Sequence, residues 1–172
     1  CAKHFAAYGF AESGRDYNTA DVGEHTLRNV ILPPFKACID ADVATVMNAF
    51  NEIGGIPATG NKYLQRDILK GEWNFKGFVI SDWGSIGEMI AHGYSKDCMQ
   101  ASEQAVNAGS DMDMESYCYI NSLKQLVEEG KVEESTIDDA VRRILRVKYK
   151  LGLFENPYLY CDMEREKNEI YT

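Results

Sequence analysis

A carboxylate and an indole directly follow a short apolar run in the middle of the sequence. The run covers residues 77–80 and leads through Ser81 into Asp82 and Trp83. A continuous apolar run of this length is typical of a strand buried on both faces of a parallel sheet. Because ligands bind beyond the carboxyl ends of such strands, Asp82 is expected at the mouth of a site. A carboxylate placed there is a candidate nucleophile, and the Trp83 ring is broad enough to stack on a sugar or a base.

Three further groups of chemically useful side chains stand at the carboxyl ends of predicted strands. They are Lys3 with His4, the segment 47–51 and the segment 111–114. In a barrel these strand ends converge on one face, so positions far apart in the sequence become neighbours of Asp82. This convergence carries more weight than any one group, because an isolated Lys-His or Ser-Asp-Trp has little specificity.

The elements that must position these residues alternate between strand and helix. Strands are predicted at 1–5, 43–49, 77–80 and 111–114, and helices at 24–40, 63–69, 96–108, 117–129 and 135–151. Such alternation predicts an α/β fold with parallel strands joined by right-handed crossovers. A whole (β/α)₈ barrel has eight strands and about 250 residues. Four consecutive β/α units therefore predict half of a TIM-like barrel.

Local signals refine these elements. Pro33 and Pro34 must break or restart the first helix, because proline lacks the amide and clashes with the preceding turn. Ser135 opens the last helix, with Asp138 placed like the acid of a capping box. The arginines of that helix are expected on a solvated or barrel-covering face. Asp111 is expected to cap an element or to pair with a basic residue, as is Asp113.

Composition limits the classes of function. A chain of 172 residues can form one domain with a sizeable core, and its net charge of −9 argues against nucleic-acid binding. No apolar run approaches the ~18 residues that a membrane helix requires. The cysteines have irregular spacings that form no metal-binding CxxC pair and no disulfide framework, so reduced structural thiols are expected at Cys1, Cys38, Cys98, Cys118 and Cys161. Since a strand begins at residue 1 with no lead-in, the chain is expected to be a piece of a longer one.

Several segments, in order, resemble glycoside hydrolase family 3, and in particular its two-domain bacterial β-glucosidases. The segments are KHFAAYG (3–9), GRDYN (14–18), LPPF (32–35), VMNAFN (46–51), GGIP (54–57), GEWNFKGFVISDW (71–83), AGSDM (108–112) and LGLF (151–154). They cover roughly residues 1–160 without large gaps, so the resemblance is specific. It implies that residues 1–154 are the C-terminal half of the catalytic (β/α)₈ barrel and that 155–172 are a linker or tail towards a second domain.

The resemblance also implies a reaction and its residues. Asp82 would be the nucleophile of a retaining, exo-acting β-glucosidase, which removes terminal β-D-glucosyl residues through a covalent glycosyl-enzyme. Five side chains would contact the sugar: Lys3, His4, Met47, Phe50 and Trp83. Lys3 and His4 would bond its hydroxyls, and Lys3 would also favour the ionised form of Asp82. Arg15 and Asp16 match a family motif and are expected to organise their loop.

A retaining glycosidase needs a second carboxylate as general acid/base. In the two-domain relatives this group comes from a later domain, so no residue is assigned to the role, and Glu52, Glu72 and Glu88 are not proposed for it. Two carboxylates and water suffice, and no cofactor or metal is implied. A β-xylosidase of the same family and a non-catalytic fragment or carbohydrate-binding half-barrel are the alternatives.

The expected partner is a β-glucoside or oligosaccharide substrate, with no nucleic acid and no membrane. Two unpaired strand edges of a half-barrel would favour self-association. Free thiols slightly favour the cytoplasm, with a periplasmic or secreted protein left open.

Overall fold

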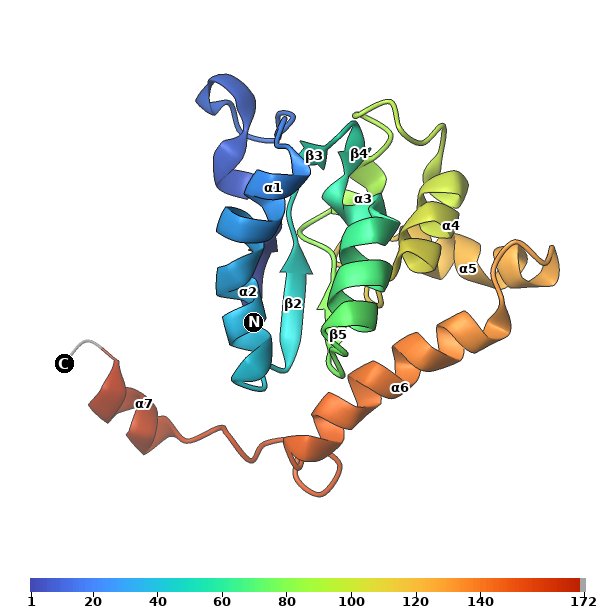
Figure 1. Ribbon diagram of the computed structural model, residues 1–172. Helices are drawn as coiled ribbons and strands as arrows, with labels where there is room; N and C mark the ends of the chain where they lie inside the picture. The colour runs from blue at the N-terminus through green and yellow to red at the C-terminus, as the bar shows by residue number, and fades with distance from the viewer. Residues whose placement is uncertain (171–172) are drawn as a thin grey trace.

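A small parallel sheet surrounded by helices forms the body of the chain (Figure 1). The computed structural model describes residues 1–170. The strands β1 (Ala2–Phe5), β2 (Thr45–Asn48) and β5 (Phe78–Ile80) pair in the order β1-β2-β5, all parallel. An antiparallel hairpin, β3 (Glu52–Ile53) with β4 (Ile56–Pro57), lies in the loop after β2. Parallel strands joined by helices confirm the predicted α/β class.

Helices fill the connections at the predicted places. The longer ones are α2 (Leu32–Asp40), the π-helical η5 (Tyr63–Glu72), α4 (Cys98–Ala108), α5 (Cys118–Glu128) and α6 (Glu134–Lys150). The shorter ones are η1 (Tyr8–Phe10), η2 (Glu12–Gly14), α1 (Glu24–Thr26), the π-helical η3 (Leu27–Ile31), η4 (Ala58–Gly60), α3 (Ser85–Glu88) and α7 (Met163–Glu169).

The first crossover helix restarts at its prolines, as predicted. The segments α1, η3 and α2 follow one another without a gap, and Pro33 and Pro34 lie in the first turn of α2. A proline is tolerated there because the first amides of a helix have no partner within that helix. The turn of π-helix before them, η3, takes up the change in hydrogen bonding.

The predicted fourth strand at 111–114 is wrong in its extent. Only one bridge, between Ile80 and Met112, joins this segment to the sheet. The carboxylate of Asp111 accepts a hydrogen bond from the Val79 backbone N–H at 2.8 Å, and the Ser81 hydroxyl accepts one from the Met114 N–H at 2.8 Å. Backbone bonds also link the two segments, from the N–H groups of Asp111 and Met112 to the Val79 carbonyl and from the Ser81 N–H to the Met112 carbonyl. The segment therefore runs beside β5 through mixed side-chain and backbone contacts with a single bridge.

The expected cap of the last helix is also wrong. α6 begins at Glu134 with Glu133 at the N-cap position, and the Glu133 side chain makes no capping bond. Ser135 already lies inside the helix, so Asp138 has no amide to accept from at its start and pairs instead with Arg142 at 2.7 Å.

The predicted tail at 155–172 contains one short helix. In α7, the Asp162 side chain accepts from the backbone N–H groups of Glu164 at 2.9 Å and Arg165 at 3.0 Å. This N-cap explains why a charged segment becomes helical. Figure 1 shows α7 beyond the end of α6, set apart from the sheet. Residues 171–172 of the predicted tail lie outside the described residues.

A disulfide between Cys98 and Cys118 corrects the expectation of five reduced thiols. The two cysteines are the first residues of α4 and α5, and their Cα atoms are 5.1 Å apart. The 20-residue spacing carried no signal, because only the packing of α4 against α5 brings the two helix starts together. Cys1, Cys38 and Cys161 are free. The slight preference for the cytoplasm loses part of its basis.

Two hydrophobic clusters hold the sheet and the helices that follow it. The first packs around the strands and includes Phe5, Val46, Leu64, Ile68 and Val79. The second joins α3, α4 and α5 and includes Ile86, Met89, Ala105, Val106 and Leu126. Asp82 therefore lies on a short connection whose two ends are each anchored in a packed core. Among the described residues, no helix is both long and apolar enough to span a bilayer.

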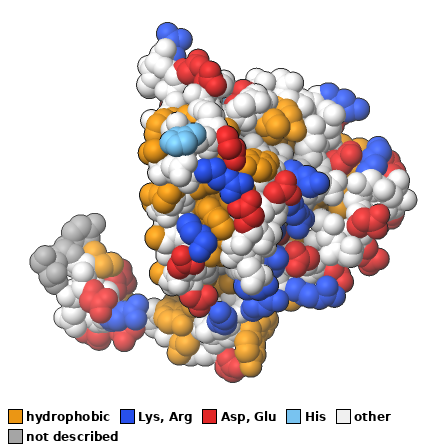
Figure 2. All heavy atoms as spheres, viewed as in Figure 1, with side chains coloured by type: hydrophobic (Ala, Val, Ile, Leu, Met, Phe, Trp, Pro, Cys, Tyr) orange, Lys and Arg blue, Asp and Glu red, His pale blue; other side chains and the backbone are white. Residues whose placement is uncertain are grey.

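The outer surface combines charge pairs with an apolar end. Acidic and basic side chains are interspersed over the face in Figure 2. On the surface, Arg28 pairs with Glu24 at 2.8 Å and with Glu72 at 2.5 Å. Exposed pairs of this kind contribute about 0–1 kcal/mol each. Hydrophobic side chains such as Leu151 and Phe154 are exposed after the end of α6. Self-association through such surfaces or through strand edges stays a prediction.

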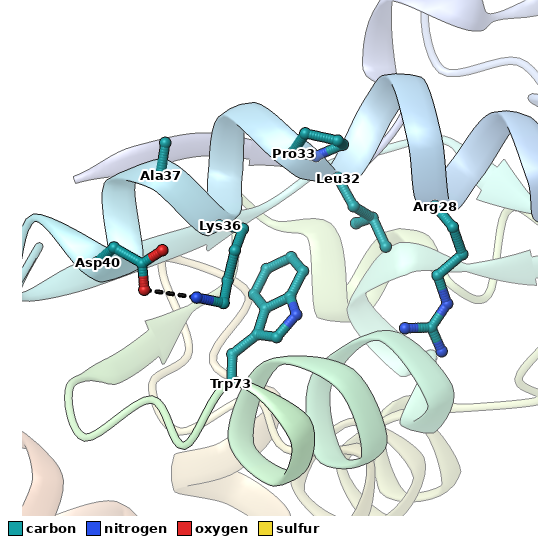
Figure 3. Close-up of a pocket in the computed structure, with 7 residues that line it drawn as sticks. All are labelled: Arg28, Leu32, Pro33, Lys36, Ala37, Asp40 and Trp73. Carbon is teal, nitrogen blue, oxygen red and sulfur yellow. Dashed lines mark hydrogen bonds and ion pairs between the residues drawn. The ribbon is translucent and has the colours of Figure 1, made fainter.

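A groove on the same side separates α2 from the end of η5. Figure 3 shows Trp73 pointing from that end towards α2, where Lys36 pairs with Asp40 at 2.5 Å. The Trp73 ring also packs edge-on against Phe5 of β1, with ring centroids 6.1 Å apart. Trp73 thus joins the helical layer to the sheet.

The arginine face of α6 anchors the segment that enters β5. The Arg143 guanidinium donates to the carbonyl oxygens of Phe75 at 2.8 Å and Gly77 at 3.0 Å, and Arg146 donates to that of Lys76 at 3.0 Å. The arginine face of α6 therefore covers the sheet through specific contacts, and these hold the start of β5, the strand that precedes Asp82.

The entry to β5 also requires a residue without a side chain. A Cβ atom at Gly77 would lie 2.0 Å from the Ala44 carbonyl oxygen and 2.6 Å from Cζ of Phe75. We expect Gly77→Ala to lower the free energy of unfolding by roughly 1–3 kcal/mol, the usual cost of overpacking. Thermal unfolding measures it. Gly9→Ala is the matched control, because a Cβ there has nothing within 4 Å; equal losses in the two variants would contradict this prediction.

A buried ammonium gives stability a pH dependence of defined sign. Burial lowers the pKa of Lys70 from 10.5 to about 8, against the opposing attraction of Asp111. Between these two values the unfolded chain holds the proton more tightly than the folded chain, so the free energy of unfolding rises with pH. We expect this group to add about 2 kcal/mol between pH 8 and pH 10 in urea unfolding. Lys70→Met should lack this rise; the same rise in that variant would assign it to another group.

Candidate active site

Asp82 lies two residues after the end of β5 and keeps little contact with solvent. Its side chain is 12% exposed. One carboxylate oxygen lies 3.3 Å from Nε2 of His4, and the other accepts a hydrogen bond from the Trp83 backbone N–H at 2.6 Å. Because each of its oxygens has a partner and little of the side chain is exposed, the carboxylate has a fixed orientation. A carboxylate fixed in this way can be positioned to attack one atom of a ligand.

The backbone around Asp82 is fixed by a network of short-range bonds. The Asp82 carbonyl oxygen accepts from the Ser81 hydroxyl at 3.0 Å and from the Ser85 N–H at 3.1 Å. Gly84 donates its N–H to the Met114 carbonyl at 2.8 Å with φ at +68°, a conformation that favours glycine. The turn that carries Asp82 is therefore tied to the segment after Asp111.

His4 receives its own support from the loop after β1. The Tyr8 ring meets the His4 ring edge-on with centroids 5.1 Å apart, and the Tyr8 hydroxyl donates to Asp16 at 2.5 Å. Burial and the bond to Asp16 raise the pKa of Tyr8 well above its ordinary value, and the Asp82 charge adds to the effect. The contact agrees with the predicted loop-organising role of Asp16, whereas Arg15 is exposed.

Lys3 lies beside this group with its side chain exposed. Together with His4, Tyr8 and Phe35 it lines a cleft of about 440 Å³. The side chain that pairs with Asp82 is His4, at 3.3 Å, and an effect of Lys3 on the charge of Asp82 stays a prediction. Sugar binding by Lys3 and His4 stays a prediction.

The other predicted contact residues lie around Asp82 in different environments. Met47 is half-buried in β2, in register with Ile80 of β5. Phe50 is half-buried after β2 and packs on Tyr17, with ring centroids 4.3 Å apart. Trp83 is 63% exposed, so its ring presents its surface to solvent. Their contact with sugar stays a prediction.

Four residues near Asp82 were not singled out as binding residues from the sequence. Nδ1 of His92 lies 2.9 Å from a Glu52 carboxylate oxygen, which joins the β5 loop to the β2 loop. Burial raises the pKa of Glu88; the charge of Asp82 raises it further, against the opposing effect of His92. Tyr17 lines the same cleft as Glu88 and His92. The four-residue spacing of Glu88 and His92 was the one available signal, because it places two polar side chains on one side of a helical turn.

Parallel β/α units with a carboxylate at the end of a strand are typical of barrel enzymes that bind ligands at that face. The structure is similar to a β-glucosidase from Listeria innocua solved with glucose, with TM-score 0.95 and 47% identity, covering 100% of this chain and 23% of that one. The similarity confirms the prediction of four β/α units resembling the second half of a TIM-like barrel, apart from the shortened fourth strand.

The sequence comparisons define the family. The Glycosyl hydrolase family 3 N terminal domain matches residues 1–147. The chain belongs to glycosyl hydrolase family 3. It is 46% identical to a periplasmic β-glucosidase of Salmonella typhimurium over 156 residues, which are 91% of this chain and 20% of that protein. It is 35% identical to a β-xylosidase of Formosa agariphila over 163 residues, 90% of this chain and 22% of that protein. The chain thus spans about a fifth of the length of these curated relatives.

Proposed function

We propose that this chain supplies the nucleophile of a retaining, exo-acting β-glucosidase, with Asp82 as the attacking carboxylate. The observation that carries the proposal is the position of Asp82. It lies two residues after β5 within a segment matched to the family, and His4 and the Trp83 N–H hold its two oxygens. Several relatives are named β-glucosidases, which supports a terminal β-D-glucosyl residue as substrate.

The proposed reaction has two steps. In the first, an Asp82 oxygen forms a bond to the anomeric carbon while the glycosidic C–O bond breaks and the leaving oxygen takes up a proton. In the second, the oxygen of a water molecule bonds to the anomeric carbon while the bond to Asp82 breaks, and the water gives a proton back to the acid/base group that protonated the leaving oxygen; the sugar is released and the carboxylate is restored. The configuration is retained because each step inverts it once.

The remaining side chains would orient the sugar. Lys3 and His4 would bond its hydroxyls at the β1 end of the site, while Trp83 would stack on a ring face. Met47 and Phe50 would line the pocket from β2. No acid/base residue is proposed in this chain. Glu72 pairs with Arg28 on the outer surface, and Glu52 pairs with His92.

A β-xylosidase of the same family is the second candidate. Its support is the similarity to relatives that carry this name. The sugars differ by one hydroxymethyl group, and an apolar contact of that size discriminates by roughly 10–200-fold. Relative kcat/KM for the two sugars would therefore separate the candidates clearly.

The proposal is tested by trapping the covalent intermediate. In 2-deoxy-2-fluoro-β-glucosyl fluoride the ring fluorine slows both steps, while fluoride leaves without needing a protonated leaving oxygen. We expect the polypeptide that carries residues 1–172 to gain one fluoroglucosyl group on a peptide containing Asp82. A label on any other residue would overturn the assignment, and faster labelling by the xylosyl analogue would favour the β-xylosidase.

A further inference from the structure

The loops that follow β1, β2 and β5 meet at one side chain, and we infer that this residue, Glu52, is a positioning residue for the nucleophile. In the sheet, β2 lies between β1 and β5. The outer strand β1 carries His4 and the outer strand β5 leads to Asp82, and these two side chains pair at 3.3 Å. The inference rests on the proposed function, because it concerns what holds this pair in place.

The Glu52 carboxylate has one partner in each neighbouring loop. Oε2 accepts a hydrogen bond from the Thr19 hydroxyl at 3.2 Å, in the loop after β1 (residues 6–23). Oε1 lies 2.9 Å from Nδ1 of His92, in the segment after β5 (residues 81–97). Since an ionised carboxylate can only accept hydrogen bonds, Nδ1 of His92 is the donor. One side chain of the middle loop therefore bonds the loops on both sides of it.

Backbone contacts reinforce the bond to the loop after β1. The Glu52 carbonyl oxygen accepts from the Ala20 N–H at 2.8 Å, and a parallel bridge joins Ala20 to Ile53. The Ala20 and Ile53 side chains are both buried in the core around the sheet. The backbone of Glu52 is thus fixed on this side, and its carboxylate extends the connection to His92.

Aromatic contacts connect the same two loops to His4. The Phe50 ring packs on Tyr17 with centroids 4.3 Å apart, and it lies 6.0 Å from the ring of Tyr8. The Tyr8 ring in turn meets His4 edge-on at 5.1 Å. Because Phe50 lies two residues before Glu52, the bonds of Glu52 to the loop after β1 also hold this row of rings. They therefore support the His4 side of the pair.

A helical turn connects His92 to the Asp82 side of the pair. The Asp82 carbonyl accepts from the Ser85 N–H at 3.1 Å, and the Gly84 carbonyl accepts from the Glu88 N–H at 3.0 Å. The Glu88 carbonyl then accepts from the His92 N–H at 3.0 Å. Since consecutive bonds link these residues, a shift of His92 is transmitted to the turn that carries Asp82.

Partial burial makes the contact between Glu52 and His92 more than a surface pair. The two side chains are 18% and 15% exposed. Removing the carboxylate would leave the Nδ1 hydrogen of His92 and the Thr19 hydroxyl without this acceptor, a larger loss than that of an exposed ion pair. Because both oxygens of Glu52 have partners in the protein, its role is to position other groups rather than to react with the sugar.

The first test measures labelling of Asp82 by 2-deoxy-2-fluoro-β-glucosyl fluoride in the polypeptide that carries residues 1–172. We expect Glu52→Ala to lower the labelling rate at saturating reagent by roughly 10–100-fold, because misplacing a reacting group by about 1 Å costs up to about 100-fold. The reagent concentration that gives half of the maximal rate should change by less than about threefold, because the lost interaction acts mainly in the transition state.

Further variants separate positioning from general damage. Glu52→Gln keeps one accepting oxygen and should label at least about threefold faster than Glu52→Ala. His92→Ala leaves the Glu52 backbone contacts intact and should lose a similar factor, and the double variant should lose little more, because the two side chains act as one unit. Glu72→Ala is the matched control: both Glu72 oxygens bond Arg28, at 2.5 and 2.8 Å, on the outer surface. Its labelling rate should stay within about twofold of the native rate.

Hydrogen exchange tests the contact without Asp82 chemistry. In folded Glu52→Ala, amides of residues 17–20 and 88–95 should exchange at least about tenfold faster, whereas those of α5 should be unchanged. Unchanged exchange in both loops, native labelling in Glu52→Ala, or independent losses from Glu52 and His92 would overturn the inference. Absence of a label on Asp82 in the native protein would count against the proposed function, while the exchange would still decide whether Glu52 holds the loops.

Discussion

Replacing Asp82 by Asn should abolish formation of the glycosyl-enzyme. An amide oxygen is a poor nucleophile and carries no charge to stabilise the cationic sugar of the transition state. Removing a nucleophile from a covalent enzyme lowers its rate by roughly 10⁴-fold or more. We expect that loss both in labelling by the fluoroglucosyl fluoride and in turnover of a nitrophenyl β-glucoside.

The expected loss is specific to the position of the carboxylate. Asn has an NH₂ group in place of one of the two Asp oxygens and is otherwise the same size. Its remaining oxygen can still accept from the Trp83 N–H, so Asp82→Asn should remain folded. Asp67→Asn is the matched control, because Asp67 is exposed on η5. A variant at Asp82 that retains more than a hundredth of the labelling rate would exclude it as the nucleophile.

The position of Asp82 is predictable because strand ends follow simple physical rules. Its apolar run, the turn residues around it and the alternation of elements all indicate a buried parallel strand, and β5 ends as expected. The contacts that hold this strand in place could not be predicted in the same way. Arg143 reaches the carbonyls before β5 from 66 and 68 residues away, and no local pattern predicts such a distance.

The same limit explains the residues that sequence reasoning missed. Glu52 and His92 are 40 residues apart, and each alone is most simply a surface side chain. Only the packing of the β2 loop against the β5 loop turns them into a pair. The Cys98–Cys118 bond is a further case, since two helix starts meet through tertiary packing. Likewise, residues 111–114 alternate aspartate with methionine, as a half-buried strand can, but the Asp111 side chain accepts the Val79 N–H bond that a neighbouring strand would otherwise make.

The buried pair of Lys70 and Asp111 connects three segments of the chain behind β5. Nζ of Lys70 lies 2.6 Å from Asp111, and the two side chains are 5% and 2% exposed. Lys70 also donates to the Gly109 carbonyl at 2.8 Å, and Asp111 accepts from the Val79 N–H. The pair therefore joins η5 to β5 and to the segment that follows α4. The predicted pairing of Asp111 with a basic residue is confirmed.

Lys70→Met should lower the free energy of unfolding by about 3–5 kcal/mol, because it leaves the Asp111 carboxylate buried without its counter-ion. Urea unfolding measures the loss. Lys36→Met is the matched control: its pair with Asp40 is exposed and should contribute at most about 1 kcal/mol. Similar losses in the two variants would show that burial does not decide the energy of the pair. Since Val79 lies three residues before Asp82 in the chain, folded Lys70→Met should also label Asp82 more slowly, whereas Lys36→Met should not.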